Sequence, residues 1–263
     1  MSKGKIKFQG VPFVEGVEVH PKGGTVGFQG TSYPVQEMAV DAPVSGRVYG
    51  TLLNYKGALA ELGEAVHQPP YHQPPIAPVL YIKPQNTLIG HGQPIPMPEE
   101  ASELEVGAAL GVVIGRRATR VSEAEALHYV TGYTVANDVS IPQDSFHRPP
   151  VMQKARDGFC PLGPWVIQRH AVANPDALGV RVFINGELRQ QNTTENLIRP
   201  VARLIADVTE FMTLDEGDVL LAGVPEGAPL AKVGDRIQIE IDHVGSLENT
   251  IVEGRGVAAG GGT

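Results

Sequence analysis

A short stretch of the chain gathers charged side chains of both signs. Asp138, Arg148, Lys154 and Asp157 all lie within Gly132–Pro164, among turn residues and aromatic groups. Burying such charges without partners would cost several kcal/mol each, so a packed core has no use for them. Two acids and two bases this close in sequence predict either a surface loop with ion pairs or a site for a small acidic molecule.

The end of this stretch is apolar. Residues 157–164 read DGFCPLGP, so the charges border a dry wall, which favours the site over the surface loop. Cys160 stands between Phe159 and Pro161, and no histidine is near it in sequence. We therefore interpret Cys160 as a small core residue and not as a nucleophile.

Longer motifs around these residues resemble those of the fumarylacetoacetate hydrolase family. GYTVANDVS and KARDGFCPLGP lie in the stretch itself, and four further motifs agree in order and spacing. They are LLNYKGALAELG (52–63), LYIKPQNTLIGHGQPIPMP (80–98), FINGELRQ (183–190) and LDEGDVLLAGVPEG (214–227). The resemblance covers roughly residues 48–253.

Within the family, the chain is most similar to the first half of the bifunctional isomerase/decarboxylases of 4-hydroxyphenylacetate (homoprotocatechuate) breakdown. LYIKPQNTLIGHGQPIPMP, SFHRPPVMQKARDGFCPLGP and ELRQQNTTENL carry that similarity. The resemblance implies a mixed β-roll with a few peripheral helices. It also implies chemistry on acidic diketones or 2-oxo acids, in which Mg²⁺ or Mn²⁺ chelates the substrate and stabilises an enolate.

The resemblance implies three carboxylate ligands for that ion, and this chain keeps one, Asp138. Gly107 and Ala109 stand where the family has a Glu-x-Glu pair, counting back from the Val-Ile-Gly that ends the next strand. Glu103 and Glu105 lie four residues too early, roughly 13 Å along a strand, and we interpret them as loop or surface charges. Since one carboxylate holds Mg²⁺ poorly, we expect the metal to be weakly bound or absent.

Other family positions are also changed. The catalytic histidine of the motif Asn-Tyr-x-x-His-x-x-Glu is replaced by Ala58, although Tyr55 and Glu61 remain. Pro142 replaces an arginine, and Val224 replaces a threonine in the Gly-x-Pro-x-Gly loop. Hydrolysis of a carbon–carbon bond needs an activated water, and the lost imidazole is its natural base. Hydrolysis is therefore the least expected of the family's activities.

A tautomerase needs fewer groups. Moving a proton between C3 and C5 of a 2-hydroxy-2,4-dienoate takes one base, one acid and a cation that holds the carboxylate. We expect Lys154 or Arg148 to supply the cation, and Lys154 also to polarise the substrate carbonyl. We expect Asp138 or Glu61, desolvated beside the apolar wall, to carry the proton. Decarboxylation of a 5-oxopent-3-ene-1,2,5-tricarboxylate needs the same dienolate, so one pocket would serve both steps.

Three more residues are candidate substrate contacts, each with a plainer alternative. Tyr55 and Gln190 would reach the substrate from the Asn-Tyr motif and from the end of a hairpin, although Gln190 could equally face water. Asp157 could bind substrate or could pair with Lys154 or Arg156 to fix the loop. By the same reasoning, Asp138 could cap a turn and Glu61 could lie on the solvated face of a helix.

Three functions stay open on these residues. The first is an active isomerase/decarboxylase of aromatic-acid catabolism. The second is a partner subunit that has lost its metal ligands and supports a metal-bearing homologue in a hetero-oligomer. The third is an acylpyruvate or fumarylpyruvate hydrolase whose metal ligands come from unusual positions. Because family members usually pair, we expect at least a dimer.

Composition narrows the class of protein. Hydrophobic residues make up 42% of the chain and charged residues 19%, as in a globular protein. The net charge of −8 argues against nucleic acid as a partner. A single cysteine excludes an internal disulfide and fits the cytoplasm. The chain lacks 18 consecutive apolar residues and an N-terminal signal peptide, so we expect no membrane partner.

Patterning predicts a mainly β (α+β) protein in three parts. The chain contains 31 glycines and 22 prolines, which favour many short strands and turns. We expect a small β-rich extension over 1–45, a catalytic domain over 46–253 and a disordered glycine-rich tail over 254–263. Strands are predicted over 110–115, 180–184 and 237–241, with a hairpin turn at 185–186, and helices over 122–131 and from Pro200 to 212.

Overall fold

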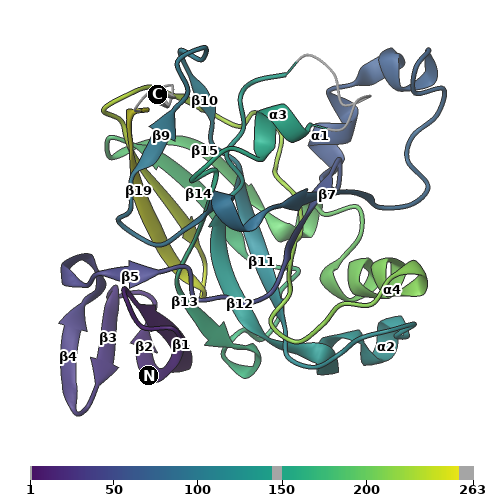
Figure 1. Ribbon diagram of the computed structural model, residues 1–263. Helices are drawn as coiled ribbons and strands as arrows, with labels where there is room; N and C mark the ends of the chain where they lie inside the picture. Colours follow the sequence, from purple (N-terminus) through teal and green to yellow (C-terminus); the bar gives the residue numbers. More distant parts are fainter. Residues whose placement is uncertain (1, 144–149, 255–263) are drawn as a thin grey trace, which may run out of the picture.

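The computed structural model describes residues 2–143 and 150–254, which form two large β-sheets and few helices (Figure 1). The larger sheet contains β1 (Ser2–Phe8), β2 (Glu15–His20), β3 (Thr25–Phe28), β4 (Thr31–Pro34), β5 (Val40–Asp41), β6 (Val48–Leu52), β7 (Val79–Lys83), β8 (Leu88–Ile89), β11 (Ala108–Ile114), β12 (Val130–Asn137), β13 (Cys160–Gln168) and β16 (Val219–Leu221). The second sheet contains β9 (Ile95–Met97), β14 (Gly179–Ile184), β15 (Glu187–Thr193), β18 (Arg236–Ile241) and β19 (Gly245–Glu253). A separate pair consists of β10 (Leu104–Glu105) and β17 (Leu230–Ala231).

Both large sheets mix parallel and antiparallel pairing. The longer path runs β4-β3-β2-β1-β13-β12-β11-β16-β6-β7, and the second sheet runs β15-β14-β18-β19-β9. Most neighbours are antiparallel, but β16 with β6, β13 with β8 and β19 with β9 are parallel. The predicted class, mainly β with a mixed sheet, is confirmed.

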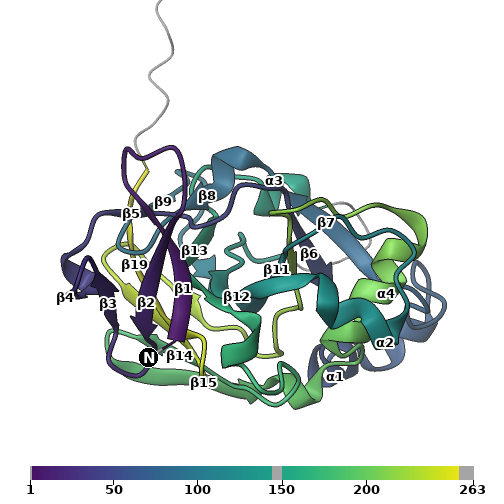
Figure 2. The ribbon, with the colours of Figure 1, turned by 90° about the horizontal axis from the view of Figure 1, so that it is seen from below.

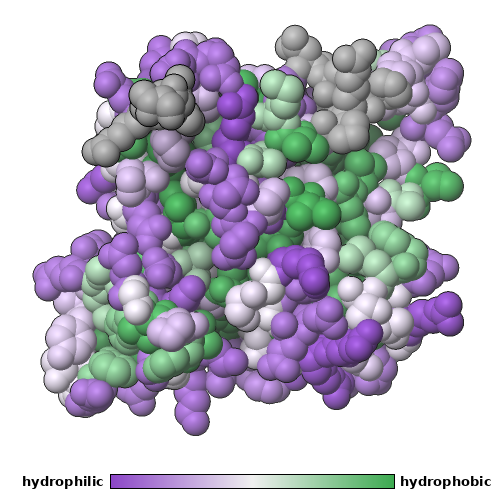
Figure 3. Space-filling view, viewed as in Figure 1, coloured by the Kyte–Doolittle hydropathy of each residue, from purple (hydrophilic) through white to green (hydrophobic). Residues whose placement is uncertain are grey.

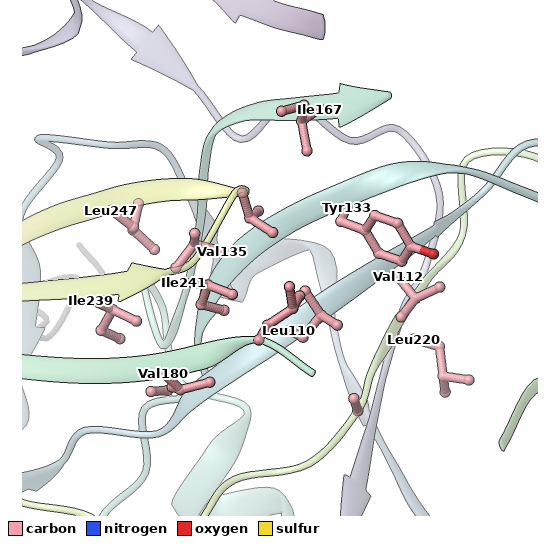
Figure 4. Packing of buried hydrophobic residues seen from close by; sticks show 14 of the residues in the cluster. Leu110, Val112, Tyr133, Val135, Ile167, Val180, Leu220, Ile239, Ile241 and Leu247 are labelled. Carbon is pink, nitrogen blue, oxygen red and sulfur yellow. The ribbon is translucent and has the colours of Figure 1, made fainter. Parts of the chain in front are cut away.

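The core lies between the two sheets. Every residue of β11 is buried, as the run Leu110–Gly115 predicts, because β12 and β16 flank the strand and its faces are covered. In Figure 4, Leu110 and Val135 of the larger sheet face Val180 and Ile239 of the second. Burial of these aliphatic side chains fixes how the two sheets pack.

Two features of the second sheet follow from local sequence patterns: a hairpin turn and a strand with one buried face. Asn185 and Gly186 have φ of 55° and 82°, as a two-residue turn between β14 and β15 requires. Along β18, Ile237, Ile239 and Ile241 are buried and alternate with half-buried polar residues. Both the hairpin and the one-sided strand are confirmed.

Four α-helices occur in the described ranges: α1 (Lys56–Ala60), α2 (Glu123–Ala126), α3 (Val151–Lys154) and α4 (Val201–Phe211). The prediction that a helix begins beside Pro200 is confirmed by α4. None of the helices in these ranges has the length and apolar character needed to cross a membrane.

The helix predicted over 122–131 is much shorter than expected. It ends as α2 at Ala126, a single 3₁₀ turn follows, and Val130 already belongs to β12. Ser122 stands at the N-cap but its side chain makes no capping hydrogen bond. Pairing of β12 on both sides, with β11 and β13, outweighs the local preference for helix.

The N-terminal strands continue the larger sheet, because β1 pairs with β13 through Gly4 opposite Ile167. Figures 1 and 2 show β1 to β4 at one end of the molecule, beside β13 and β19. The predicted disordered tail, apart from Gly254, lies outside the described residues, and so does Arg148.

Candidate active site

Asp138 is the centre of a buried ionic cluster. It directly follows β12, and 1% of its surface is exposed. Nζ of Lys83 lies 2.8 Å from its Oδ1, and Nζ of Lys154 donates to its Oδ2 at 2.8 Å. The hydroxyl of Tyr81 also donates to Oδ2. One carboxylate therefore joins β7, β12 and α3.

Lys83 acts as a structural cation. Its three N–H groups donate to the backbone oxygens of Val139, Lys154 and Phe159 at 2.8, 2.9 and 2.8 Å. Its ammonium group also forms an ion pair with Asp138 Oδ1 at 2.8 Å. Burial lowers the pKa of Lys83, and the Asp138 charge opposes that shift.

Lys154 is the cation with donors to spare. It ends α3, its side chain is 5% exposed, and among the described residues only Asp138 accepts a hydrogen bond from Nζ. Nζ also lies 5.0 Å from the centre of the Tyr81 ring. That ring fits because β6 carries glycine at position 50, where a β-carbon would lie 2.0 Å from the ring. Within residues 2–143 and 150–254, two of the three N–H groups of Lys154 therefore have no acceptor and could serve a ligand.

The two ammonium groups keep Asp138 ionised. Burial alone raises the pKa of this carboxyl, but Lys154 and Lys83 outweigh burial and bring the pKa to about 2. A carboxylate with so low a pKa is a poor proton carrier near neutral pH. The structure therefore favours Asp138 as the anchor of Lys154 over the proton-carrying role that its sequence context suggests.

Glu105 lies on the same face of the sheet as Asp138. The backbones of Glu105 and Ser140 form an antiparallel bridge, and Asp138 N–H donates to the Gly107 oxygen at 2.7 Å. This register continues that of Ala108 opposite Asn137. Directly opposed residues point to one face, and so do residues two apart, so Glu105 and Asp138 share a face.

The interpretation of Glu105 as a loop or surface charge is therefore wrong. A shift of an even number of residues moves a side chain along a strand but leaves it on the same face. Its carboxylate is close enough to contribute to the raised pKa of Tyr81, after burial and Asp138. Glu103, by contrast, pairs with the exposed Lys232 at 3.3 Å, as a surface charge does.

The residues around Asp138 do not fit a divalent ion held as the family resemblance implies. Gly107 and Ala109 provide no ligand, and a β-carbon at position 107 would lie 2.4 Å from the Asp138 backbone oxygen. Both Asp138 carboxylate oxygens already face ammonium groups. Within 2–143 and 150–254, no three His, Cys, Asp or Glu side chains converge as a metal site.

A second polar group surrounds Glu226 on the loop after β16. Asn192 donates to Glu226 Oε1 at 3.0 Å, and Gln190 Nε2 donates to the Glu226 backbone oxygen at 2.6 Å. Among the described residues, three buried atoms here have no hydrogen-bond partner: Tyr55 Oη, Gln190 Oε1 and Glu226 Oε2. Burial, and then the charge of Glu226, raises the pKa of Tyr55. Unpaired polar atoms in such number suggest a site that a ligand completes.

The short helix α1 links the two polar groups. Tyr55 is its N-cap and Glu61 its C-cap, so they lie roughly 9 Å apart along the helix. Ala58, in place of the family's histidine, lies between them and packs on the core. Glu61 is exposed, and its charge adds to the raised pKa of Glu105.

Asp157 and Cys160 are the remaining residues that the sequence singles out. Asp157 is exposed and accepts a hydrogen bond from Asn86 Nδ2 at 2.7 Å, a contact that fixes its own loop. Cys160 is fully buried, and burial raises the pKa of its thiol to about 12, as a core position requires.

Lys83, Tyr81 and Glu105 were missed from the sequence. A signal was present for two of them: in the apolar run Val79–Lys83, Tyr81 and Lys83 share one face, and the alternate residue Ile82 is 58% exposed. A lysine on the inward face of a strand needs an acidic partner. For Glu105, the signal was its position two residues before Gly107. Residues an even number apart on a strand point to the same face.

The chain is similar to known proteins in sequence and in fold. A family model described as "Fumarylacetoacetate (FAA) hydrolase C-terminal" matches residues 47–252. The 4-hydroxyphenylacetate degradation bifunctional isomerase/decarboxylase of Escherichia coli is 40% identical over 214 residues, which are 81% of this chain and 49% of that protein. The chain thus spans about half the length of that relative.

Two solved structures are similar over nearly their whole length. The 5-carboxymethyl-2-hydroxymuconate delta-isomerase from Mycobacterium smegmatis superposes with a TM-score of 0.78 at 30% identity, covering 97% of this chain and 100% of that one. The 2-hydroxyhepta-2,4-diene-1,7-dioate isomerase from Mycobacterium marinum gives 0.76 at 29% identity, with 96% and 98% covered. The chain belongs to the fumarylacetoacetate hydrolase family.

Proposed function

We propose that this chain is an isomerase/decarboxylase of 4-hydroxyphenylacetate catabolism. Its substrates would be a 2-hydroxy-2,4-diene-1,7-dioate and a 5-oxopent-3-ene-1,2,5-tricarboxylate. The observation that carries the proposal is the buried ammonium group of Lys154, which Asp138 holds in place and which donates to no other described residue. The activities named for the similar proteins support the same substrate class.

In this proposal Lys154 binds the 2-oxo-carboxylate and offsets the negative charge of the dienolate. An ammonium group in a dry site stabilises developing charge more strongly than it would in water. Lys83 neutralises the second oxygen of Asp138, so Asp138 orients Lys154 without adding a free negative charge. Isomerisation of the substrate's 2-oxo-4-ene tautomer moves a proton from C3 to C5 through this dienolate.

Decarboxylation would use the same cation. The electron pair of the breaking carbon–carboxylate bond enters the conjugated system and gives the dienolate, and CO₂ leaves. A proton then adds to carbon. The step needs no further cofactor, so it is compatible with a site in which Gly107 and Ala109 replace two of the family's three metal ligands.

The far end of the substrate would lie against Tyr55 and Gln190, whose unpaired polar atoms support this placement. Glu61, at the exposed end of α1, remains a proposed proton-exchange group toward solvent. Arg148 and Asp157 remain proposed substrate contacts from their sequence context.

The protein would work as a dimer or with a homologous partner. Ile82 on the edge strand β7 and Val151 and Met152 on α3 are 58%, 65% and 70% exposed. Hydrophobic residues gather on this face in Figure 3, which supports a protein contact there. A metal-bearing homologue is the alternative partner, suggested by the longer bifunctional relative, of which the aligned part of this chain covers 49%. We also propose a cytoplasmic location, in keeping with the unpaired Cys160.

The test is turnover of the purified chain on both substrates, with and without EDTA. We expect isomerisation and CO₂ release that persist in chelator. Activity only after addition of a metal-bearing homologue would support the partner-subunit function. Hydrolysis of an acylpyruvate that requires Mg²⁺ or Mn²⁺ would support the hydrolase instead.

A further inference from the structure

Glu105 carries a carboxylate with no assigned contact. It is half-buried, and among the described residues its side chain takes part in no ion pair or hydrogen bond. Its backbone is fixed from both sides, by the bridge to Ser140 and by pairing with Leu230 of β17. A fixed backbone with an uncommitted acid at the end of its side chain is the arrangement that proton transfer needs.

The strand register places this carboxylate beside the cationic site. Glu105 is the diagonal neighbour of Asp138, at roughly 7–8 Å between the two positions. The position between them on that face is Gly107, which has no side chain. On the segment that pairs with the end of β12, Glu105 is therefore the nearest residue with a side chain on the face of Asp138.

The other nearby acids are less suited to carry a proton. Asp138 is held ionised by two ammonium groups. Glu61 is exposed at the C-terminal end of α1, so solvent reaches it directly. Burial raises the pKa of Glu105; Lys154 opposes that shift, and Asp138 and Glu61 add to it. A carboxyl with a raised pKa exchanges protons with carbon acids more readily.

We propose that Glu105 is the catalytic residue that carries the proton between C3 and C5 of the substrate. The step starts from the 2-oxo-4-ene tautomer of the substrate, in which C3 is a CH₂ group beside the carbonyl. The Glu105 carboxylate takes a proton from C3, and the electron pair of the C3–H bond enters the dienolate opposite Lys154. The resulting carboxylic acid returns the proton to C5, so the double bond moves from C4–C5 to C3–C4 and Glu105 is regenerated. This role rests on the proposed isomerase function.

The experiment compares Glu105→Gln with Glu103→Gln, a matched control on the same segment whose carboxylate pairs with Lys232 at the surface. Isomerisation of the 2-hydroxydienoate and deuterium exchange at C3 of 2-oxoadipate are both measured. The saturated acid cannot isomerise, so its exchange reports proton abstraction alone. For Glu105→Gln we expect kcat and the exchange rate to fall about 10²–10⁴-fold, with KM within threefold.

Glu103→Gln should retain the wild-type rates, and Glu105→Asp should recover part of the loss. The acid limb of the wild-type pH profile should be absent in Glu105→Gln, which a purely structural role would not cause. Wild-type rates in a folded Glu105→Gln, checked by its melting curve, would overturn the role of Glu105 alone. An inactive wild type in both assays would overturn the proposed function and this role together.

Discussion

Gly107 lies directly opposite Asp138, and a β-carbon at Gly107 would stand 2.4 Å from the Asp138 backbone oxygen. The two chain segments approach more closely here than any side chain at 107 allows. A glutamate at this position, as in the family's metal-binding pattern, would force the end of β12 away. The cationic site therefore depends on a glycine where a metal site would need an acid.

We predict that turnover is insensitive to chelators. With the two glutamate positions filled by Gly107 and Ala109, EDTA should change kcat by less than twofold. Gly107→Glu should not create a metal site and should destabilise the fold by about 1–3 kcal/mol through overpacking. Calorimetric titration with Mn²⁺ and thermal melting check both statements. Stoichiometric Mn²⁺ binding to the wild type would contradict them.

Lys154→Ala should abolish turnover and leave the fold intact. Asp138 keeps its ion pair with Lys83 and its hydrogen bond from Tyr81, so the remaining charge is not left unpaired. We expect kcat/KM to fall at least about 100-fold, as for loss of a transition-state cation. The control is Lys232→Ala, which removes an exposed lysine. Unchanged steady-state kinetics in Lys154→Ala would remove the proposed cation.

Lys83→Met should affect mainly stability. The substitution leaves three buried backbone oxygens without the ammonium donor and removes half of the charge that faces Asp138. We expect the free energy of unfolding to fall by about 3–5 kcal/mol. Urea denaturation followed by circular dichroism measures it. A loss below about 1 kcal/mol would show that Lys83 does not hold these segments together.

Tyr55→Phe should separate binding from stability. The hydroxyl of Tyr55 is buried and has no hydrogen-bond partner among the described residues, so its removal breaks no hydrogen bond within them. We expect an equal or slightly higher melting temperature and a KM raised about tenfold. A lower melting temperature with unchanged KM would assign Tyr55 to the fold and not to the substrate.

His91 should make the protein less stable in mild acid. It is buried, its Nδ1 accepts the Glu248 N–H at 3.1 Å, and burial lowers its pKa from 6.5 to about 4. A depressed folded pKa gives stability that is complete above the unfolded value and is lost as pH falls. The free energy of unfolding should drop by up to about 3 kcal/mol between pH 6.5 and 4.

The matched variant is His91→Asn, whose side-chain oxygen can accept the same N–H without titrating in this range. Urea denaturation at several pH values should show a flatter profile for the variant. An identical pH dependence in both proteins would mean that other groups cause the acid loss.

The sequence alone predicts the elements whose patterns are local. The hairpin at Asn185-Gly186, the one-sided strand β18 and the start of α4 at Pro200 all follow from turn chemistry and periodicity. The helix predicted over 122–131 is too long because Val130 pairs with Ile114 of β11 and so belongs to β12. Long-range pairing of this kind leaves no trace in the local pattern.

In the site too, local motifs predict some residues, and long-range pairing brings in the others. Motifs place Asp138 and Lys154 in one neighbourhood, and the structure brings them within hydrogen-bond distance. Lys83 arrives from a strand 55 residues earlier than Asp138, and the register that turns Glu105 toward Asp138 is fixed by pairing between separate segments. Such neighbours are set by the fold, and a single sequence does not reveal them.

The first strand also shields the outer edge of β13, since Gly4 and Lys5 pair with Ile167 and Val166. A chain shortened to begin near Gly46 would leave that edge with unmet backbone donors and acceptors. Bare edges of this kind recruit strands from neighbouring molecules, so the leading residues would serve as a guard against aggregation.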